Sequence, residues 1–452
     1  MDIIIVGCGK VGTALAKQLR KENHNITIVD TDRSSVEALI NTLDVQAVYG
    51  NGTTYRVLKR AGVDTADLLI AVTGYDERNM LSCLVARKAS RCQVIARVRD
   101  PEYNEDTDFL KDELGLSMVI NPEMAAAANI FRLLQIPSAL DVDYFEKSQV
   151  SMLCFRVESD SPLNGHNMFE IGSMMKSNML VCIRERDGEA EIPSGNTTLL
   201  AGDKISVMIP MNRMRDVLQK LKLRQKPVRN CLIGGGSATA QYLTGMLLHE
   251  GVQVKIIDRD RVKCDELSDK FPDAEIVCGD CTDKQLLAEE GLDRTDAFVC
   301  LTSLDEVNIM LSLYASSVSK AKIVSKISRT DFEEVVDRLN IGSVIYPKNI
   351  TAESIVQYVR ALENAQGNNA ETLYQLADGK VEAMEFEVHK REGITGIPLM
   401  DMRLKKGLLI ASITRKGRHI TPSGQDTLEE GDTIILLTTN PGIRDLANII
   451  DG

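Results

Sequence analysis

The chain carries one sequence unit twice, and this repeat constrains its fold more than any single motif does. The matching segments are residues 2–19 with 230–246, 26–32 with 254–260, 50–80 with 279–309, 119–123 with 344–348, and 192–209 with 421–438. Within the third pair, Gly50, Gly62, Asp67, Thr73, Asp76 and Asn79 stand in step with Gly279, Gly291, Asp296, Thr302, Asp305 and Asn308. Each half must therefore fold as an equivalent unit. The two halves meet in the basic, proline-containing segment 221–229.

Short apolar runs alternate with helical patterns in each half. The runs of the first half are IIIV, ITIV, QAVY, LLIAV and VIARV. This alternation predicts parallel strands joined by crossover helices, which form a doubly wound sheet. After about Leu140 and again after about Gly367 the chain is rich in strand and turn signals, which predicts a smaller α+β domain. We expect an α/β protein with two Rossmann-type doubly wound parallel sheets, each followed by a small α+β domain.

A helix opened by a proline should connect each large domain to its small domain. The expected divisions are a large domain at 1–121, a connecting helix at 122–140, a small domain at 141–224, a second large domain at 225–346, a second connecting helix at 347–366 and a second small domain at 367–452. Apolar residues at helical spacing are Met124, Ala128, Phe131 and Leu134 in the first helix, and Ile355, Val356, Val359 and Leu362 in the second. These faces pack either on their own domain or on an equivalent unit.

Composition excludes several classes of function. Lys plus Arg number 53 and Asp plus Glu number 65, and the resulting net charge of −12 repels nucleic acid. The most apolar long stretch, 118–136, is interrupted by Asn121, Pro122, Glu123 and Arg132, so no membrane span is expected. The N-terminus leads into a strand pattern rather than a signal peptide, and the ten cysteines are scattered. We expect a cytoplasmic protein that meets a membrane only through a partner.

The strongest chemical motif is a glycine loop near the N-terminus. Gly7-x-Gly9-x-x-Gly12 follows a strand and opens a helix, and Asp30 ends the next strand. The first glycine permits a tight turn, the second lets a pyrophosphate approach the backbone, and the third lets the helix pack on the strand. Asp30 would bind ribose hydroxyls and repel a 2′-phosphate. The motif therefore predicts a site for NAD or an adenine nucleotide.

Other residues of the first half should complete this site. Cys8, Lys10 and Val11 lie within the loop, and Lys10 is a cation placed to face phosphate. Residues at the carboxyl ends of other strands are Asn51, Gly52, Thr73, Gly74 and Arg97. Ordinary turn chemistry is the alternative explanation for Asn51 and Gly52. Arg97 ends an apolar strand and needs an anion, either a phosphate or a helix aspartate; Lys326 takes its place in the second half.

The corresponding loop of the second half is less complete. Its candidate residues are Gly234, Gly235, Gly236, Ser237, Ala238 and Asp258. Gly234 and Gly236 match Gly7 and Gly9, Thr239 replaces the third glycine, and Ser237 replaces Lys10. This alignment predicts a second nucleotide site that binds weakly or is empty.

Groups for catalysis are missing from the pattern. The five histidines (24, 166, 249, 389 and 419) are far apart in the sequence and suggest no acid–base pair. Cys278-Gly-Asp-Cys281 has no second cysteine pair or nearby histidine, so a loop with two buried thiols is favoured over a zinc or redox site. We therefore predict no catalytic residue, no metal site and no enzymatic activity.

These motifs together resemble a known family. The sequences GCGKVG with Asp30 and GGGSAT with Asp258, the TADLLIAVT and RTDAFVCLT strands, and the two PSG-containing segments are similar to the RCK repeat, a TrkA-N domain followed by a TrkA-C domain. The duplicated form resembles the peripheral regulatory subunits of Trk-type potassium uptake systems. This resemblance implies a cytoplasmic homo-oligomer, a tetramer, that binds NAD(H) and ATP or ADP and gates a membrane potassium transporter.

Two other classes stay open at this point. An NAD-dependent oxidoreductase would also use the glycine loop, although it needs an acid or base that the sequence does not show. A redox-sensing transcription repressor would need a basic recognition helix, and none is evident.

Overall fold

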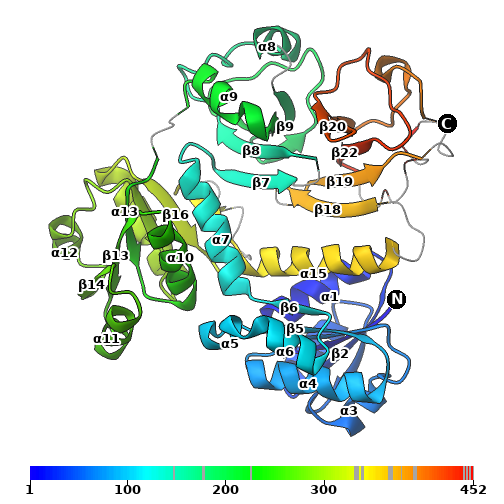
Figure 1. Cartoon of the computed structure of the whole chain (residues 1–452), viewed down its shortest axis with the longest axis vertical. Helices are drawn as coiled ribbons and strands as arrows, with labels where there is room; N and C mark the ends of the chain where they lie inside the picture. The colour runs from blue at the N-terminus through cyan, green and yellow to red at the C-terminus, as the bar shows by residue number, and fades with distance from the viewer. Residues whose placement is uncertain are drawn as a thin grey trace. The chain divides into compact units, whose positions relative to one another are not determined.

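The computed structural model describes residues 1–145, 148–175, 179–223, 227–329, 335–336, 339, 341–364, 370–377, 379–389, 394–440, 443, 446 and 449–450. The expected domain boundaries at 224/225 and 366/367 lie outside the described residues. The chain divides into two compact units. One contains Met1–Phe131, Asn230–Glu333 and Val344–Val356, and the other contains Arg132–Arg229, Glu334–Ser343 and Gln357–Gly452. The first unit thus holds both large domains and the second holds both small domains (Figure 1).

The first large domain is a six-stranded sheet in the order β3-β2-β1-β4-β5-β6, and its strands pair in parallel. The strands are β1 (Asp2–Val6), β2 (Asn25–Asp30), β3 (Gln46–Tyr49), β4 (Leu68–Ala71), β5 (Gln93–Arg97) and β6 (Met118–Ile120). The helices are α1 (Lys10–Lys21), α2 (Arg33–Ile40), α3 (Tyr55–Arg60), α4 (Asp76–Ala89), α5 (Pro101–Glu105) and α6 (Thr107–Leu114). All five predicted strands are present; β6 was missed because three residues give too short a pattern.

The second large domain repeats this topology in the order β14-β13-β12-β15-β16-β17. Its strands are β12 (Asn230–Gly234), β13 (Gln253–Asp258), β14 (Glu275–Cys278), β15 (Ala297–Cys300), β16 (Lys322–Lys326) and β17 (Ser343–Ile345). The helices described between them are α10 (Ala238–His249), α11 (Arg261–Lys270), α12 (Lys284–Glu289) and α13 (Asp305–Val318). The central strands β4 and β15 are buried along their whole length, as expected when helices cover both faces of a parallel sheet. The predicted fold class is confirmed.

The small domains are antiparallel sheets in the orders β10-β9-β11-β8-β7 and β18-β19-β22-β20-β21. The first contains β7 (Asp141–Phe145), β8 (Val150–Arg156), α8 (Met168–Met175), β9 (Leu180–Arg186), β10 (Glu189–Glu191), β11 (Lys204–Pro210), the 3-10 helix η1 (Met211–Arg213) and α9 (Met214–Lys220). The second contains β18 (Ala370–Leu376), β19 (Val381–Glu387), η3 (Leu399–Asp401), β20 (Leu408–Arg415), β21 (Arg418–Ile420) and β22 (Thr433–Thr438). One apolar core, which includes Phe145, Met152, Leu376 and Ile435, joins the two sheets.

The two connecting helices are α7 (Pro122–Gln135) and α15 (Pro347–Asn364). In α15, the predicted face of Ile355, Val356 and Val359 is buried, and Leu362 is half-buried. In α7 the predicted face is wrong. Leu134 is buried, but Met124 is exposed and Ala128 and Phe131 are half-buried; the buried face consists of Ala126, Ala127, Ile130, Leu133 and Leu134. Four successive small residues hid the orientation of α7 from the hydropathy pattern, because alanine fits either face of a helix.

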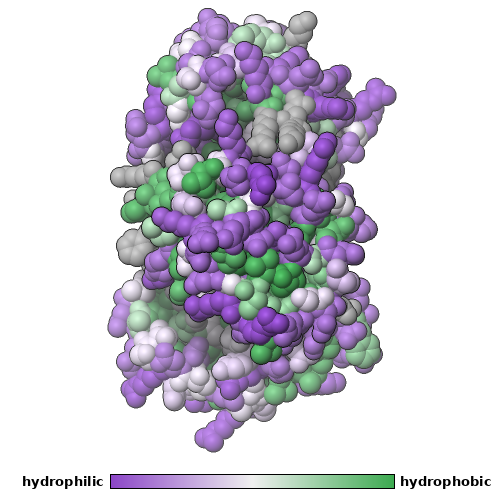
Figure 2. Space-filling model, turned by 90° about the vertical axis from the view of Figure 1, so that its left-hand side faces the viewer, coloured by the Kyte–Doolittle hydropathy of each residue, from purple (hydrophilic) through white to green (hydrophobic). Residues whose placement is uncertain are grey.

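Among the described residues, no helix is long and apolar enough to cross a membrane. The face of the molecule drawn in Figure 2 is largely hydrophilic, with hydrophobic residues in smaller groups between the polar ones.

Candidate functional site

A cavity of about 620 Å³ lies at the carboxyl ends of the strands of the first large domain. In the observed strand order, β1 and β4 are neighbours whose crossover connections run to opposite sides, and this is the place where open α/β sheets bind ligands. The cavity is lined by Gly7, Cys8, Gly9, Lys10, Val11, Asp30, Asn51, Gly52, Thr73, Gly74 and Arg97. Every residue predicted for the first site lines this cavity except Gly12, which lies beneath the loop.

The three glycines of the first loop have different reasons to be glycine. Gly7 has a φ of 111°, and a Cβ there would lie 3.0 Å from the backbone of Thr73. A Cβ on Gly12 would lie 1.9 Å from the carbonyl oxygen of Gly7, so α1 can approach the loop only without a side chain. A Cβ on Gly9 meets nothing within 4 Å, so it would project into open space. That space is what a pyrophosphate requires at the N-terminus of α1.

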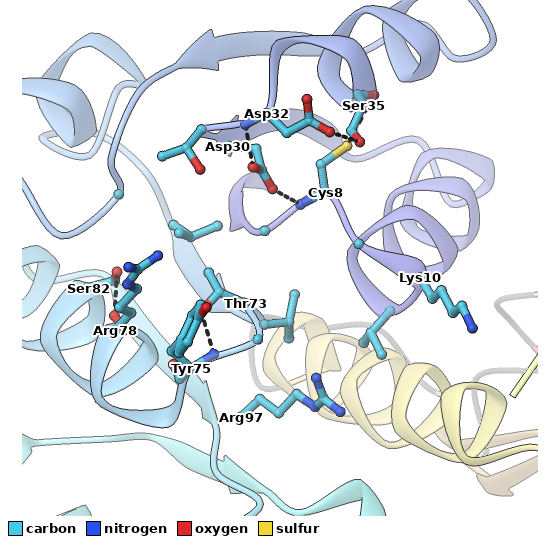
Figure 3. Close-up of a pocket in the computed structure, with 18 of the residues that line it drawn as sticks. Cys8, Lys10, Asp30, Asp32, Ser35, Thr73, Tyr75, Arg78, Ser82 and Arg97 are labelled. Carbon is cyan, nitrogen blue, oxygen red and sulfur yellow. Dashed lines mark hydrogen bonds between the residues drawn. The ribbon is translucent and has the colours of Figure 1, made fainter. Parts of the chain in front are cut away.

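Asp30 organises the loop. Its carboxylate accepts hydrogen bonds from the backbone N–H of Cys8 at 2.5 Å and of Asp32 at 2.9 Å. Asp32 in turn caps α2 by accepting from the N–H of Ser34. A carboxylate offers about four acceptor positions, so Asp30 retains capacity for two ribose hydroxyls. Figure 3 shows Cys8, Asp30, Asp32 and Ser35 on one side of the pocket, and Tyr75, Arg78 and Arg97 on the other.

Several residues predicted for the first site also form hydrogen bonds or close contacts within their own domain. Thr73 donates its hydroxyl hydrogen to Asn79 Oδ1 at 2.7 Å, and the backbone N–H of Thr73 donates to the same oxygen at 2.8 Å. The Asn51 side chain accepts from the N–H of Thr53 at 3.0 Å, which is an Asx turn. A Cβ on Gly52 would lie 2.4 Å from Val6 Cγ1. Asn51 and Gly52 therefore have roles in the local turn and packing, as the alternative explanation expected, and they also line the cavity.

Arg97 stands at the end of β5 and forms one ion pair among the residues that the structure describes. Its guanidinium lies 3.6 Å from Glu123 Oε1, while its Nε is buried without a hydrogen-bond partner among the described residues. The Arg97 carbonyl accepts from Asn79 Nδ2 at 2.9 Å, which fixes the backbone that carries the side chain. Burial lowers the pKa of Arg97, and the charge of Glu123 opposes that effect.

The cavity also contains residues of the second half, which sequence reasoning did not assign to this site. They are Thr239, Lys326, Ser328, Pro347 and Lys348. Further lining residues that the sequence pattern did not single out are Asp32, Ser35, Tyr75, Arg78 and Glu123. Tyr75 carries the guanidinium of Arg78 over its ring at 4.3 Å. Of these residues, the sequence pattern pointed only to Lys326, which is the counterpart of Arg97. Contacts between two separate sheets leave no local pattern in the sequence, so the other residues could not be assigned to this cavity.

The sequence alignment of the second glycine loop was wrong by one residue. The counterpart of Gly7 is Gly235, which has a φ of 99° and packs beside Thr302 as Gly7 packs beside Thr73. The backbone N–H of each glycine also donates to the second strand of its own sheet, at 2.9 Å for Gly7 and 2.8 Å for Gly235. Gly234 is instead the last residue of β12, in the place of Val6.

The corrected alignment changes the meaning of the second motif. Ser237 takes the place of Gly9, Ala238 that of Lys10, Thr239 that of Val11 and Ala240 that of Gly12. A dinucleotide phosphate approaches the backbone most closely at the Gly9 position, and the equivalent residue of the second domain, Ser237, carries a side chain there. A Cβ on Gly234 would lie 3.7 Å from Cys281, which stands in the place of Gly52; this is an ordinary contact distance, so packing does not require glycine at position 234.

Asp258, the acidic residue that accompanies the second loop, is bound by backbone N–H groups and by a lysine of its own domain. Asp258 accepts from the N–H of Gly236 at 2.7 Å and of Asp260 at 3.0 Å, and the Lys263 ammonium lies 3.4 Å away. Burial alone would raise the pKa of Asp258, but these hydrogen bonds and the lysine charge hold the pKa below its ordinary value. The cavity is lined by none of the six residues predicted for a second site, namely Gly234, Gly235, Gly236, Ser237, Ala238 and Asp258.

All ten cysteines are described, and they are free thiols. Cys281 is buried but Cys278 is exposed, so the prediction of two buried thiols in this loop was half wrong. Burial raises the pKa of the Cys281 thiol to about 11. Within the described residues, no group of three His, Cys, Asp or Glu side chains could hold a metal ion.

The matching families define the class of protein, which is built from TrkA-N and TrkA-C domains. The TrkA-N family matches residues 3–122 and 231–347, and the TrkA-C family matches residues 383–451. The chain belongs to the TrkA family of Trk-system potassium uptake proteins. This membership confirms the family resemblance, and it contradicts the alternative of an NAD-dependent oxidoreductase, because the family is one of regulatory potassium uptake subunits.

Curated relatives match along nearly the whole chain. The TrkA protein of Halomonas elongata is 31% identical over 99% of this chain and 98% of its own length. The TrkA homolog of Archaeoglobus fulgidus is 30% identical over 96% of this chain and 97% of its own length. Among solved structures, the GsuK channel bound to NAD has a TM-score of 0.63 and 20% identity, over 97% of this chain and 76% of that one. This structural likeness supports the fold.

Proposed function

We propose that the first large domain binds NAD(H) or an adenine nucleotide at the glycine loop. The open space above Gly9 carries this proposal, because that position lies at the N-terminus of α1 and a side chain would fill it. The free N–H groups of α1 would hold the phosphates, Lys10 would add a positive charge, and Asp30 would accept from the ribose. The remaining predicted residues, Asn51, Gly52, Thr73, Gly74 and Arg97, would enclose the ligand.

The second large domain takes no nucleotide of its own in this proposal. Lys263 neutralises Asp258, and Ser237 fills the position where Gly9 leaves room. Each chain then binds one nucleotide.

Nucleotide occupancy regulates a membrane potassium transporter of the Trk type. The chain acts as a homotetramer on the cytoplasmic side and reaches the membrane only through that transporter. Family membership supports this role, and the neighbouring structures titled GsuK bound to NAD and GsuK bound to ADP support the ligand class. A ligand can shift the transporter only by binding one conformation of the assembly better than another.

Two measurements test the proposal. Calorimetry on the full chain should show NADH and ADP competing for one site per chain. Vesicles that hold the partner transporter should show a potassium flux that responds to nucleotide only after the protein is added. Failure of both nucleotides to bind, or a strict monomer by light scattering, would contradict the corresponding step.

A further inference from the structure

Two thiols of the second large domain, those of Cys264 and Cys278, lie beside the same backbone carbonyl. Cys264 belongs to α11, and its Sγ donates to the Asp258 carbonyl oxygen at 3.2 Å. Cys278 ends β14 as the parallel partner of Asp258, and the N–H of the next residue, Gly279, donates to the same oxygen at 2.9 Å. The two sulfur atoms are close enough for a hydrogen bond between the side chains. The fold therefore brings together two thiols that lie on different elements.

The first large domain has no thiol at either of these positions. Val36 stands at the position of Cys264, and Tyr49 stands at the position of Cys278. In both domains the helix residue is buried and the strand residue is exposed. The shared architecture thus requires no sulfur at either position, and packing alone does not explain a pair of thiols here.

The CxxC spacing suggests Cys281 as the partner of Cys278, but the structure places Cys281 elsewhere. Cys281 belongs to the apolar core that contains Phe298, and its Sγ lies 3.7 Å from the position of a Cβ on Gly234. Cys278 is exposed, whereas Cys264 and Cys281 are buried. A reagent in solution therefore reaches Cys278 first, and Cys264 is the thiol in contact with it.

The two thiols differ in the way that a pair reacting in sequence requires. Burial, and after it the hydrogen bond and charge of Cys278, raise the pKa of Cys264 to about 11; the charges of Asp258 and Asp265 act in the same direction. Cys264 is therefore protonated at neutral pH and does not compete for a reagent. Once Cys278 is bonded to another sulfur, it carries no charge, so its effect on the pKa of Cys264 disappears. The first reaction thus makes the second thiol easier to ionise.

We propose that Cys278 and Cys264 form a thiol–disulfide site that a low-molecular-weight disulfide oxidises. The Cys278 thiolate attacks one sulfur of the reagent, so a bond to Cys278 forms, the sulfur–sulfur bond of the reagent breaks, and one half leaves as a thiolate. Cys264 then releases its proton and attacks Cys278 Sγ, which forms the Cys264–Cys278 bond and releases the second half. The protein loses two hydrogen atoms, and the reagent gains them as two small thiols. The new bond ties α11 to β14, and the reaction requires no bound nucleotide.

The test treats the reduced full chain with 2-hydroxyethyl disulfide at neutral pH and measures its intact mass and its peptides after an acid quench. The wild type should lose the mass of two hydrogen atoms and give one linked pair of peptides, which contain Cys264 and Cys278. The mixed disulfide at Cys278 should account for less than about a tenth of the chains at the end of the reaction. Dithiothreitol should restore the starting mass. A wild type that stops at the mixed disulfide, leaves Cys278 unmodified or joins Cys278 to Cys281 would overturn the proposal.

Three variants assign the roles of the thiols. C264S keeps a hydrogen-bond donor beside the Asp258 carbonyl, and it should stop at the mixed disulfide with one half of the reagent on Cys278. C278S should give neither product. C281A is the matched control, because it removes the other cysteine of the CxxC motif and should form the disulfide as the wild type does. Loss of the mixed disulfide from C264S at the wild-type rate would show that another thiol attacks Cys278 and would refute the pairing.

Discussion

The Lys263 ammonium lies 3.4 Å from Asp258 Oδ2, whereas Ser35 occupies the position equivalent to Lys263 beside Asp30. In the proposed function, the first domain therefore keeps the Asp30 carboxylate available for a ribose, whereas Lys263 neutralises the Asp258 carboxylate in the second domain. We predict one nucleotide per chain for the wild type.

The double variant K263S/S237G should create a second site, because it gives the second loop a free carboxylate and the open glycine position of the first. Calorimetric stoichiometry for ADP should rise from one toward two per chain. Two equivalent sites in the wild type would contradict this explanation, and K270S, on the same helix, serves as the control.

Most of the fold followed from the sequence because the repeat reports each element twice. The loop alignment failed where the repeat itself is ambiguous, since the run Gly234-Gly235-Gly236 offers two alignments with Gly7-Cys8-Gly9. Only backbone geometry separates them, through the positive φ of Gly235 and the hydrogen bond that its N–H donates to the Ile257 carbonyl. The contribution of Lys326 and Thr239 to the first cavity depends on how two sheets meet, which no local pattern encodes.

Substitutions of the second and third glycines in the first loop should fail in different ways. G9A adds a methyl group to open space, so the thermal unfolding midpoint should change little while ADP affinity falls at least about tenfold. G12A places a Cβ 1.9 Å from the Gly7 carbonyl oxygen and should cost about 1–3 kcal/mol of folding stability. Calorimetry together with thermal unfolding separates the two effects. An unstable G9A or a wild-type-like G12A would refute the assignment of these roles.

The pair Val6 and Gly52 in the first domain corresponds to the pair Gly234 and Cys281 in the second. In the first pair the strand residue supplies the side chain and the loop residue is glycine, and in the second pair the strand residue is glycine and the loop residue supplies the side chain. A Cβ on Gly52 would meet Val6 Cγ1 at 2.4 Å. G52C should therefore destabilise the chain by about 1–3 kcal/mol through overpacking, and V6G/G52C should recover part of that loss. Chemical unfolding of both single variants and the double variant gives the coupling. Additive effects would show that the two positions do not share the space.

Cys278 should be the first thiol to react in the native protein. It is the exposed member of the ten cysteines, while burial raises the pKa of thiols such as Cys264 to about 11. Mass spectrometry after brief treatment with iodoacetamide should show one modified thiol per chain, located at Cys278, and C278S should show almost none. Rapid labelling of several thiols in the folded protein would contradict the buried positions.

His419 should make the small domains less stable in acid. The sequence suggests no special environment for it, but the ring lies between Ser412 and Thr421, with 3.1 Å from Nδ1 to Ser412 Oγ and 3.1 Å from Nε2 to Thr421 Oγ1. Burial lowers the pKa of His419 from its ordinary 6.5 to about 4. The unfolded chain therefore binds a proton between these pH values that the folded chain does not, and the unfolding free energy falls as the pH drops below about 6.5.

At about 1.4 kcal/mol per pKa unit, the loss on reaching pH 4 is at most about 3 kcal/mol, and it is smaller because the ring is partly exposed to solvent. Urea unfolding of the wild type and H419Q between pH 4 and 7 measures this contribution. The difference between the two proteins should shift in favour of H419Q as the pH falls. H166Q is the matched control, because the His166 ring is exposed and its Nδ1 lies 3.1 Å from Oε2 of Glu170, four residues further along the chain. Parallel curves for the wild type and H419Q over this pH range would show that His419 titrates alike in the folded and unfolded chains.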